Sequence, residues 1–244
     1  MKNPLLIDVP ERLVTPRLFL RCARPGDGAA MHAAVLASLA ELQPWMPWAQ
    51  ADTGAEEAEL TARRMAARYA SREDLSLLIF GRDEQGGEGL VLGGTGLHRM
   101  DWSVPRFEIG YWRRSGFGGI GIVDEAVRAV SRMAFDALRA LRVEIRMDAR
   151  NAASIRVAER AGFSSEGLLR QDALDVQGVP RDTSVYSRVR GIEEPERRAR
   201  AAHSAPLRQP TARARLAKRS ISSLIKPSTG SASRRSTSAG SLTV

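Results

Sequence analysis

The middle of the chain reads Phe107-Glu108-Ile109-Gly110-Tyr111-Trp112-Arg113-Arg114-Ser115-Gly116-Phe117-Gly118-Gly119-Ile120-Gly121, an apolar strand that runs into a glycine-rich turn. A helix is expected to follow, from about residue 121 to 138. The first N–H groups of a helix have no partner within it, and its dipole is positive at that end. Glycines placed before it let a phosphate approach the backbone closely. The unit therefore predicts a phosphate cradle, although a flexible strand-to-helix connection would also explain the glycines.

The P-loop motif does not fit this turn, which lacks the Gly-Lys-Ser/Thr ending. Residues 116–121 do have the G-x-G-x-x-G spacing, so the spacing by itself does not separate this turn from a dinucleotide site.

Strands and helices alternate around the turn. The patterns predict about seven strands, near residues 18–22, 75–80, 90–98, 106–112, 142–147, 163–176 and 183–189. They predict about four helices, near residues 29–42, 56–69, 121–138 and 151–161, the first capped by Asp27 and the last ended by Gly162. This order indicates one α/β (α+β) domain with a central, mixed but mostly antiparallel sheet.

The positive charge of the chain is concentrated at one end. Residues 191–244 hold eleven Lys/Arg and three Asp/Glu, which is +8 of the net +9 and leaves +1 for residues 1–190. The segment 191–244 also has few large apolar residues, so we predict a basic, disordered tail. Nucleic-acid contact is an expectation for this tail alone.

Composition also bounds the compartment and the cofactors. The sequence has no apolar run long enough for a membrane span and no signal-peptide pattern at its start. The single cysteine, Cys22, excludes an internal disulfide and fits a reducing, cytoplasmic location. Cys22 is expected to be a packing residue. No cluster of side chains has metal-ligand spacing, so no metal is expected.

Four separated motifs carry a resemblance to a known family. They are Leu13–Arg21, Phe107–Arg114, the glycine-rich turn, and Asn151–Phe163. Together they resemble the GNAT superfamily, in its RimJ/RimL-like branch of N-terminal amine acetyltransferases, over about residues 12–190. The resemblance implies the GNAT fold and acetyl-CoA as the acyl donor.

The same resemblance implies which residues bind the coenzyme. The family's pyrophosphate pattern, Arg/Gln-x-x-Gly-x-Gly/Ala, falls on residues 118–123, where Gly121 matches but Gly118 and Val123 depart from it. The residues implied to bind the coenzyme in this loop are Gly118, Gly119, Ile120, Gly121 and Ile122. Backbone N–H groups at Tyr111, Trp112 and Arg113 are implied to contact pantetheine and the thioester carbonyl, which is an oxyanion-hole arrangement. Asn151 is expected beside pantetheine, as a helix N-cap, or as both.

Acyl transfer from a thioester to an amine needs a base and an acid. Glu108 is the candidate base, acting through one water, although it could instead be a solvated edge glutamate. His98 is an alternative base or a structural residue. Where many superfamily members have an acidic tyrosine, this chain has Ala158, and Ser154 matches the serine that RimJ/RimL-like enzymes carry instead. Ser154 is therefore expected to contact the coenzyme sulfur and to protonate it.

The acceptor side is less determined by the sequence. Trp45 and Trp48 lie between prolines and either line the acceptor groove or cover the core. The leading hypothesis is acetylation of a primary amine at a protein N-terminus, of the ribosomal-protein type. The alternatives are a small-molecule amine (amino acid, polyamine or aminoglycoside) and a non-enzymatic, coenzyme-binding module that contacts the ribosome or RNA through the tail. A homodimer is a further expectation.

Overall fold

Eight strands form one sheet within residues 3–49 and 54–195, the part of the chain that the computed structural model describes. Their order across the sheet is β1-β2-β3-β4-β5-β6-β8-β7, and every neighbouring pair is antiparallel except β5 and β6. The strands are β1 (Arg12–Val14), β2 (Leu18–Arg21), β3 (Leu75–Arg82), β4 (Glu88–Asp101), β5 (Arg106–Arg113), β6 (Arg142–Asp148), β7 (Ser164–Leu174) and β8 (Pro180–Val189). The predicted mixed, mostly antiparallel sheet is confirmed. The strand missed by the sequence is β1, which at three residues is too short to show a period.

The helices also follow the predicted order, with one division. They are the 3-10 helix η1 (Pro4–Leu6), then α1 (Gly28–Leu36), α2 (Leu39–Leu42), α3 (Ala55–Ser71), α4 (Ile122–Asp136) and α5 (Ala152–Arg160). The single helix predicted over 29–42 is wrong, because the chain bends at Ser38. The buried Ser38 hydroxyl donates to Ala34 O and accepts the N–H of Ser115. A serine that bonds the backbone in this way competes with the helical pattern.

Asp27 occupies the predicted N-cap position of α1, but its side chain does not cap the helix, for a tertiary reason. The Asp27 carboxylate makes no capping bond and instead pairs with Arg21, at 2.6 and 2.9 Å. The Glu59 carboxylate on α3 accepts the N–H groups of Gly26 and Gly28 in its place. The start of α1 is therefore satisfied by a side chain from another helix.

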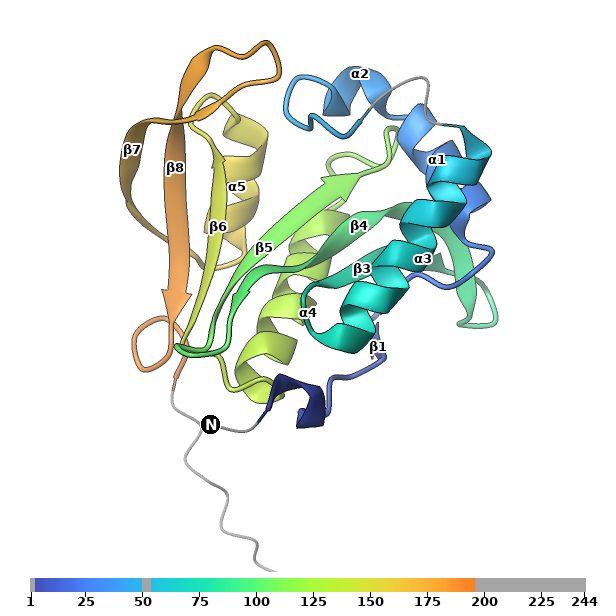
Figure 1. Ribbon diagram of the computed structural model, residues 1–244, viewed down its shortest axis with the longest axis horizontal. Coiled ribbons are helices and arrows are strands. Elements are labelled where there is room, and N and C mark those ends of the chain that lie inside the picture. The colour runs from blue at the N-terminus through green and yellow to red at the C-terminus, as the bar shows by residue number, and fades with distance from the viewer. Residues whose placement is uncertain (1–2, 50–53, 196–244) are drawn as a thin grey trace, which may run out of the picture. The chain divides into compact units, whose positions relative to one another are not determined.

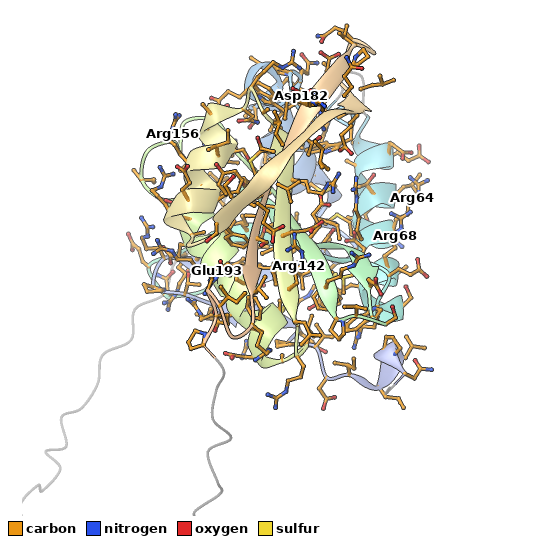
Figure 2. The ribbon with its side chains drawn as sticks, turned by 90° about the vertical axis from the view of Figure 1, so that its left-hand side faces the viewer. Arg64, Arg68, Arg142, Arg156, Asp182 and Glu193 are labelled. Atoms are coloured by element: carbon orange, nitrogen blue, oxygen red, sulfur yellow. The ribbon has the colours of Figure 1, made fainter. Side chains whose placement is uncertain are left out.

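Helices cover both faces of the sheet (Figure 1). On one face α4 buries Ala126, Val127, Val130 and Ala134 against the main core. On the other face, α1 and α3 pack over β3 and β4 through a second cluster that includes Ala58 and Ala62. The opposite side of α3 is charged and points outward, as Arg64 and Arg68 show in Figure 2. This alternation is the amphipathic pattern that the sequence of α3 and α4 predicts.

The neighbouring parallel strands β5 and β6 separate toward their C-terminal ends. β5 and β6 pair only from Arg106↔Arg142 to Glu108↔Glu144. Beyond that point β5 continues along β4 as far as Arg113, and β6 continues along β8 as far as Asp148. The opening between the two strands is visible in Figure 1, and it leaves one edge of β5 without a strand partner.

The described chain ends shortly after β8. Residues 191–195, which the sequence assigns to the tail, turn back on β8 through a bond from Val189 N–H to the Glu193 carboxylate and through an Arg188–Glu194 ion pair. The rest of the predicted basic tail, residues 196–244, lies outside the described residues.

Candidate active site

A cleft and a cavity meet at the parting of β5 and β6. The cleft, of about 230 Å³, lies between the two strands and includes Glu108, Asn151 and Ser154 in its walls. The cavity, of about 600 Å³, lies on the sheet face covered by α1 and α3. Gly110 and Tyr111 of β5 line both. A ligand in the cleft and another in the cavity would therefore meet at the middle of β5.

The glycine-rich turn leads from β5 to the N-terminus of α4. Gly116, Gly119 and Gly121 have φ of +86°, +75° and +73°, which favours glycine over residues with a side chain. In the described chain, the N–H groups of residues 116–121 donate no hydrogen bond. A Cβ at Gly116 or Gly119 would meet no atom within 4 Å. The turn thus has the open backbone donors that a phosphate group requires.

Arginine side chains hold this turn in place. Arg17 donates to the carbonyls of Ile120 and Gly121, at 2.5 and 3.2 Å, and pairs with Glu125 at 2.6 Å. Asp124 in the first turn of α4 pairs with Arg160 at 2.7 Å. Both carboxylates near the helix N-terminus are therefore neutralised, which lowers their repulsion toward an anion. The sequence places Arg17 in a motif but gives no sign of this role.

Arg113 lies beside the position where the family pattern has its Arg or Gln. A Cβ at Gly118 would come within 3.4 Å of the Arg113 guanidinium. Arg113 donates to Glu41 of α2 at 2.7 Å and to Arg114 O at 2.8 Å. The space beside Gly118 is therefore filled by a cation from the preceding strand.

The free edge of β5 supplies backbone donors. Arg114 N–H donates to Leu92 O on β4. Because donors alternate along a strand, the N–H of Trp112 faces β4, whereas those of Tyr111 and Arg113 face the opening toward β6. Of the three residues implied by the family pattern, Tyr111 and Arg113 have the orientation that an oxyanion hole needs.

Ser154 and Tyr111 come together in the cleft. The Tyr111 hydroxyl lies 2.7 Å from Ser154 Oγ and donates to Ser154 O at 3.0 Å. Asn151 caps α5 by accepting the N–H of Ser154 at 3.0 Å, so its capping role is observed. Burial raises the pKa of Tyr111 to about 12, and the bond to Ser154 opposes this only in part. Tyr111 therefore remains a proton donor at working pH, a role of its side chain that the sequence did not indicate.

Ala158, which stands where many superfamily members have an acidic tyrosine, is a core residue in this structure. It is fully buried in the main core, where α5 packs against the sheet. The hydroxyl nearest to Ser154 is instead that of Tyr111, which reaches the cleft from β5.

Glu108 lies where β5 and β6 separate. Its side chain is 16% exposed, and Oε2 has no hydrogen-bond partner although Arg99 Nε is 3.4 Å away. Burial raises the pKa of Glu108, with the Arg99 charge opposing the shift and the Glu144 charge adding to it. A carboxyl with a raised pKa is a candidate proton acceptor, so the structure does not favour the solvated-edge interpretation.

This raised pKa gives a stability prediction. Because the folded pKa lies above the unfolded one, the contribution of Glu108 to stability is present at low pH and lost as pH rises through the folded value. Glu108→Gln should therefore raise the free energy of unfolding at pH 7 by about 1 kcal/mol, since it removes a poorly satisfied buried charge. At pH 4 the difference should nearly vanish. Denaturant unfolding at both pH values measures it.

A substitution at Glu144, the residue paired with Glu108 on β6, is the control for Glu108→Gln. Glu144→Gln alters the partner of Glu108 in the β5–β6 register, but it breaks an ion pair with Arg142 at 2.8 Å. We expect it to lower stability or leave it unchanged at pH 7. A loss of stability in Glu108→Gln at pH 7 would contradict the assignment of a poorly satisfied buried charge at Glu108.

The two tryptophans of the proline-flanked loop line different compartments. Trp48 lines the cavity and packs edge-to-face on Trp112, with ring centroids 5.9 Å apart. Trp45 lines the cleft instead. A Cβ at Gly94 would lie 2.4 Å from Trp112 Nε1, so the indole lies against the bare backbone of β4. The loop thus borders both the cleft and the cavity.

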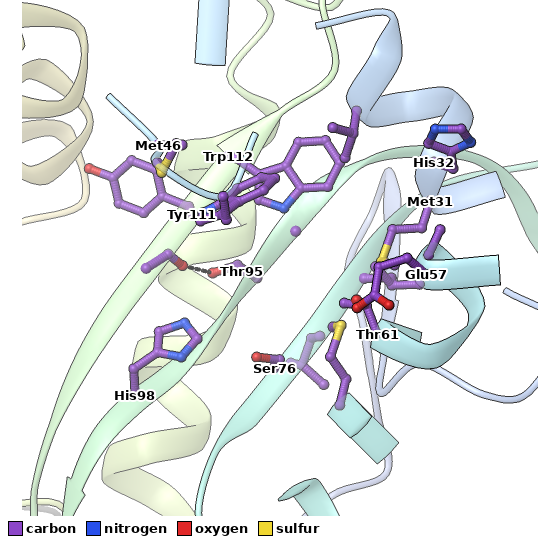
Figure 3. Close-up of a pocket in the computed structure, with 18 residues that line it drawn as sticks. Met31, His32, Met46, Glu57, Thr61, Ser76, Thr95, His98, Tyr111 and Trp112 are labelled. Carbon is purple, nitrogen blue, oxygen red and sulfur yellow. Dashed lines mark hydrogen bonds between the residues drawn. The ribbon is translucent and has the colours of Figure 1, made fainter. Parts of the chain in front are cut away.

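His98 is among the residues that line the cavity (Figure 3), and its ring is paired with an acid, Asp74. Its Nδ1 lies 2.6 Å from Asp74 Oδ2, and Ser76 donates to the other Asp74 oxygen. Burial alone would raise the pKa of Asp74, but the bonds from His98 and Ser76 outweigh it and lower the pKa. Nothing in the sequence signals Asp74, which lies 24 positions from His98.

The other sequence-based expectations concern Cys22, metals and membranes. Burial raises the pKa of the half-buried Cys22 thiol to about 11, which fits a packing role. Within residues 3–49 and 54–195, no group of three or more His, Cys, Asp or Glu side chains is arranged to hold a metal ion. No helix among the same residues is long and apolar enough to cross a membrane.

Comparison with known proteins identifies the family. Residues 17–164 match the family model described as an acetyltransferase (GNAT) domain. The chain is 31% identical over 179 residues to a putative ribosomal N-acetyltransferase, YdaF, of Bacillus subtilis (strain 168), covering 71% of this chain and 92% of the relative.

Solved structures show the same relationship. RimL, a ribosomal L7/L12 alpha-N-protein acetyltransferase in complex with coenzyme A, superposes with a TM-score of 0.66 at 26% identity, over 75% of this chain and 98% of that one. RimJ of Mycobacterium smegmatis in complex with CoA-disulfide gives 0.65 at 25% identity, over 74% and 84%. With its parted β5 and β6 and its glycine-rich turn before α4, the chain belongs to the GNAT acetyltransferases, in their RimJ/RimL-like branch.

Proposed function

We propose that the chain transfers an acetyl group from acetyl-CoA to the amine of a protein N-terminus. One observation carries this proposal: the cleft between β5 and β6 shares Gly110 and Tyr111 of β5 with a separate cavity on the face covered by α1 and α3. A thioester bound along the cleft would present its carbonyl to an amine entering from the cavity. The names of the relatives, among them a putative ribosomal N-acetyltransferase and an alpha-N-protein acetyltransferase, support this acceptor class.

The chain's own groups can be assigned to the donor side. Residues 118–122 and the N-terminus of α4 would bind the pyrophosphate, and the Tyr111 and Arg113 N–H groups would stabilise the carbonyl oxygen. Ser154 would protonate the leaving sulfur, and the Tyr111 hydroxyl, 2.7 Å from Ser154 Oγ, would return a proton to this oxygen. Glu108 would receive the proton lost by the amine, through an intervening carrier.

The residues that line the cavity indicate which class of amine it would accept. Its side chains are mainly apolar, and Glu57 is the one carboxylate among its described residues. The apolar group includes Met31, Val35, Met46, Trp48, Met65 and Trp112. Polyamines and aminoglycosides carry several cationic amines, each of which needs a counter-charge once water is removed. A single amine next to an apolar side chain fits the cavity better, so we propose a polypeptide N-terminus with an apolar first residue.

A thiol-release assay with matched acceptors tests this function. Short peptides that differ only at the first residue should show a kcat/KM about 30-fold higher for a Leu or Met start than for an Asp start, because burying such a side chain contributes about 2 kcal/mol. The same peptides with a blocked N-terminus should be inactive. Spermidine and an aminoglycoside serve as competing acceptors. Faster turnover of either than of every peptide would overturn the proposed acceptor class.

A further inference from the structure

The proposed function does not name the group that first accepts the proton from the acceptor amine. Glu108 lines the cleft but not the cavity from which the acceptor enters. A proton from the acceptor nitrogen must therefore reach Glu108 through another group. In the antiparallel register, the residue directly opposite Glu108 on β4 is His98. Directly opposed residues place their side chains on the same face of the sheet.

The His98 ring is placed at the point where the two compartments meet. Its side chain is 34% exposed and lines the cavity. A Cβ on Gly110 would lie 2.9 Å from both Nε2 and Cδ2, so this ring edge rests on the bare backbone of β5. Gly110 immediately precedes Tyr111, whose N–H faces the opening. The Nε2 edge thus lies one residue from the backbone donor that is expected to hold the thioester oxygen.

Asp74 fixes the state in which His98 can act. A carboxylate 2.6 Å from Nδ1 accepts a hydrogen bond from Nδ1–H and so leaves Nε2 with its lone pair. The same carboxylate stabilises the imidazolium once Nε2 is protonated. Its second oxygen is occupied by Ser76, so the carboxylate cannot turn away without losing that bond.

We propose that His98, oriented by Asp74, is the base that takes the proton from the acceptor nitrogen. The inference rests on the proposed acetyl transfer and names its first proton acceptor. As the neutral amine forms the N–C bond, nitrogen loses one proton to His98 Nε2. The C–S bond breaks, and the sulfur keeps the electron pair and gains one proton from Ser154. His98 then releases its proton toward Glu108 and solvent, while Ser154 recovers one, so the products are an amide and a free thiol.

The pH dependence of turnover distinguishes this role from a structural one. His98→Gln should lower kcat at pH 7 by about 10²-fold, the usual contribution of a positioned base. The loss should shrink as the pH rises, because hydroxide can then take the proton. Other titratable or charged groups face His98 or share its cavity, and they are Asp74, Glu108, Arg99, Glu57, His32 and Tyr111. His32→Gln makes the same change on α1 in the same cavity. Because His32 lines the acceptor cavity, its replacement is allowed to change KM for the peptide, but the pH dependence of kcat should match that of the wild type.

Two further variants keep the inference testable if His98→Gln folds poorly. Asp74→Asn retains the imidazole but loses the negative charge behind it, so kcat should fall about tenfold with KM for the peptide little changed. In His98→Ala, added imidazole should restore part of kcat. Affinity for acetyl-CoA, measured by calorimetry, reports whether each variant is folded and should stay at the wild-type value.

The outcomes separate the inference from the function on which it rests. Wild-type turnover of peptides together with an unchanged pH profile and kcat in His98→Gln would overturn the role of His98 alone. A changed pH dependence of kcat in His32→Gln, with that of His98→Gln unchanged, would also overturn the role of His98. Absence of amine acetylation by the wild-type chain, with acetyl-CoA bound, would overturn the proposed function itself.

Discussion

Gly119→Val should weaken acetyl-CoA binding by about 10³-fold, because it removes two or more charge-assisted backbone hydrogen bonds of about 2 kcal/mol each. Gly119 has φ of +75°, and nothing lies within 4 Å of a Cβ built there. A valine would therefore project into the open space in front of the α4 N-terminus, where the pyrophosphate is expected. A β-branched residue also resists this backbone conformation, which disturbs the neighbouring N–H groups. Calorimetry and the rise in Tm on adding acetyl-CoA measure the effect.

A valine at a second glycine, Gly26, separates the effect of backbone strain from the loss of phosphate contacts. Gly26 also has a positive φ, +98°, and equally open surroundings, but it precedes α1 and its N–H already donates to the Glu59 carboxylate, whereas the N–H of Gly119 is free of such a bond within the described chain. Gly26→Val should lower Tm through backbone strain and leave acetyl-CoA affinity unchanged. Normal acetyl-CoA affinity in Gly119→Val would rule out the turn as the pyrophosphate site.

Ser154→Ala should lower kcat by about 10³-fold without changing acetyl-CoA affinity, because a positioned proton donor acts on the leaving sulfur and not on binding. The structure supports this role through the Tyr111 hydroxyl, 2.7 Å from Ser154 Oγ. Ser154→Thr keeps the hydroxyl and should recover much of the rate. Steady-state kinetics at saturating acetyl-CoA, with a peptide acceptor, gives the comparison.

The chemical origin of this loss can be checked in two ways. An acyl donor whose leaving thiol is more acidic needs less help from an acid, so the difference between Ser154→Ala and wild type should narrow. Tyr111→Phe should also lower kcat, and the double variant should be no slower than Ser154→Ala, because the two hydroxyls act in sequence. Equal kcat for wild type and Ser154→Ala would remove Ser154 from the reaction.

The apolar cavity and the charge distribution point to different kinds of partner. The cavity, with its single described carboxylate Glu57, favours an acceptor that is apolar next to its amine. The basic segment of the chain, residues 191–244, lies mostly outside the described residues, so its expected nucleic-acid contact stays a prediction. Acceptor choice by the domain can therefore be tested with short peptides, independently of the tail.

The sequence alone determined the parts of this protein that depend on local chemistry. The glycine-rich turn, the helix that follows it, and the helix between Asn151 and Gly162 all form as predicted, because their caps, periods and positive-φ positions are properties of neighbouring residues. The mixed sheet follows from the order of these elements.

Only the tertiary structure decided how the site is assembled. The hydroxyl of Tyr111 meets Ser154 across 43 positions, Asp74 meets His98 across 24, and Glu59 rather than Asp27 satisfies the start of α1 across 31 to 33. Each of these contacts depends on which helix packs on which strand, and no local pattern encodes that choice. The parting of β5 and β6 has the same origin, since each strand follows its own antiparallel neighbour once their short parallel pairing ends.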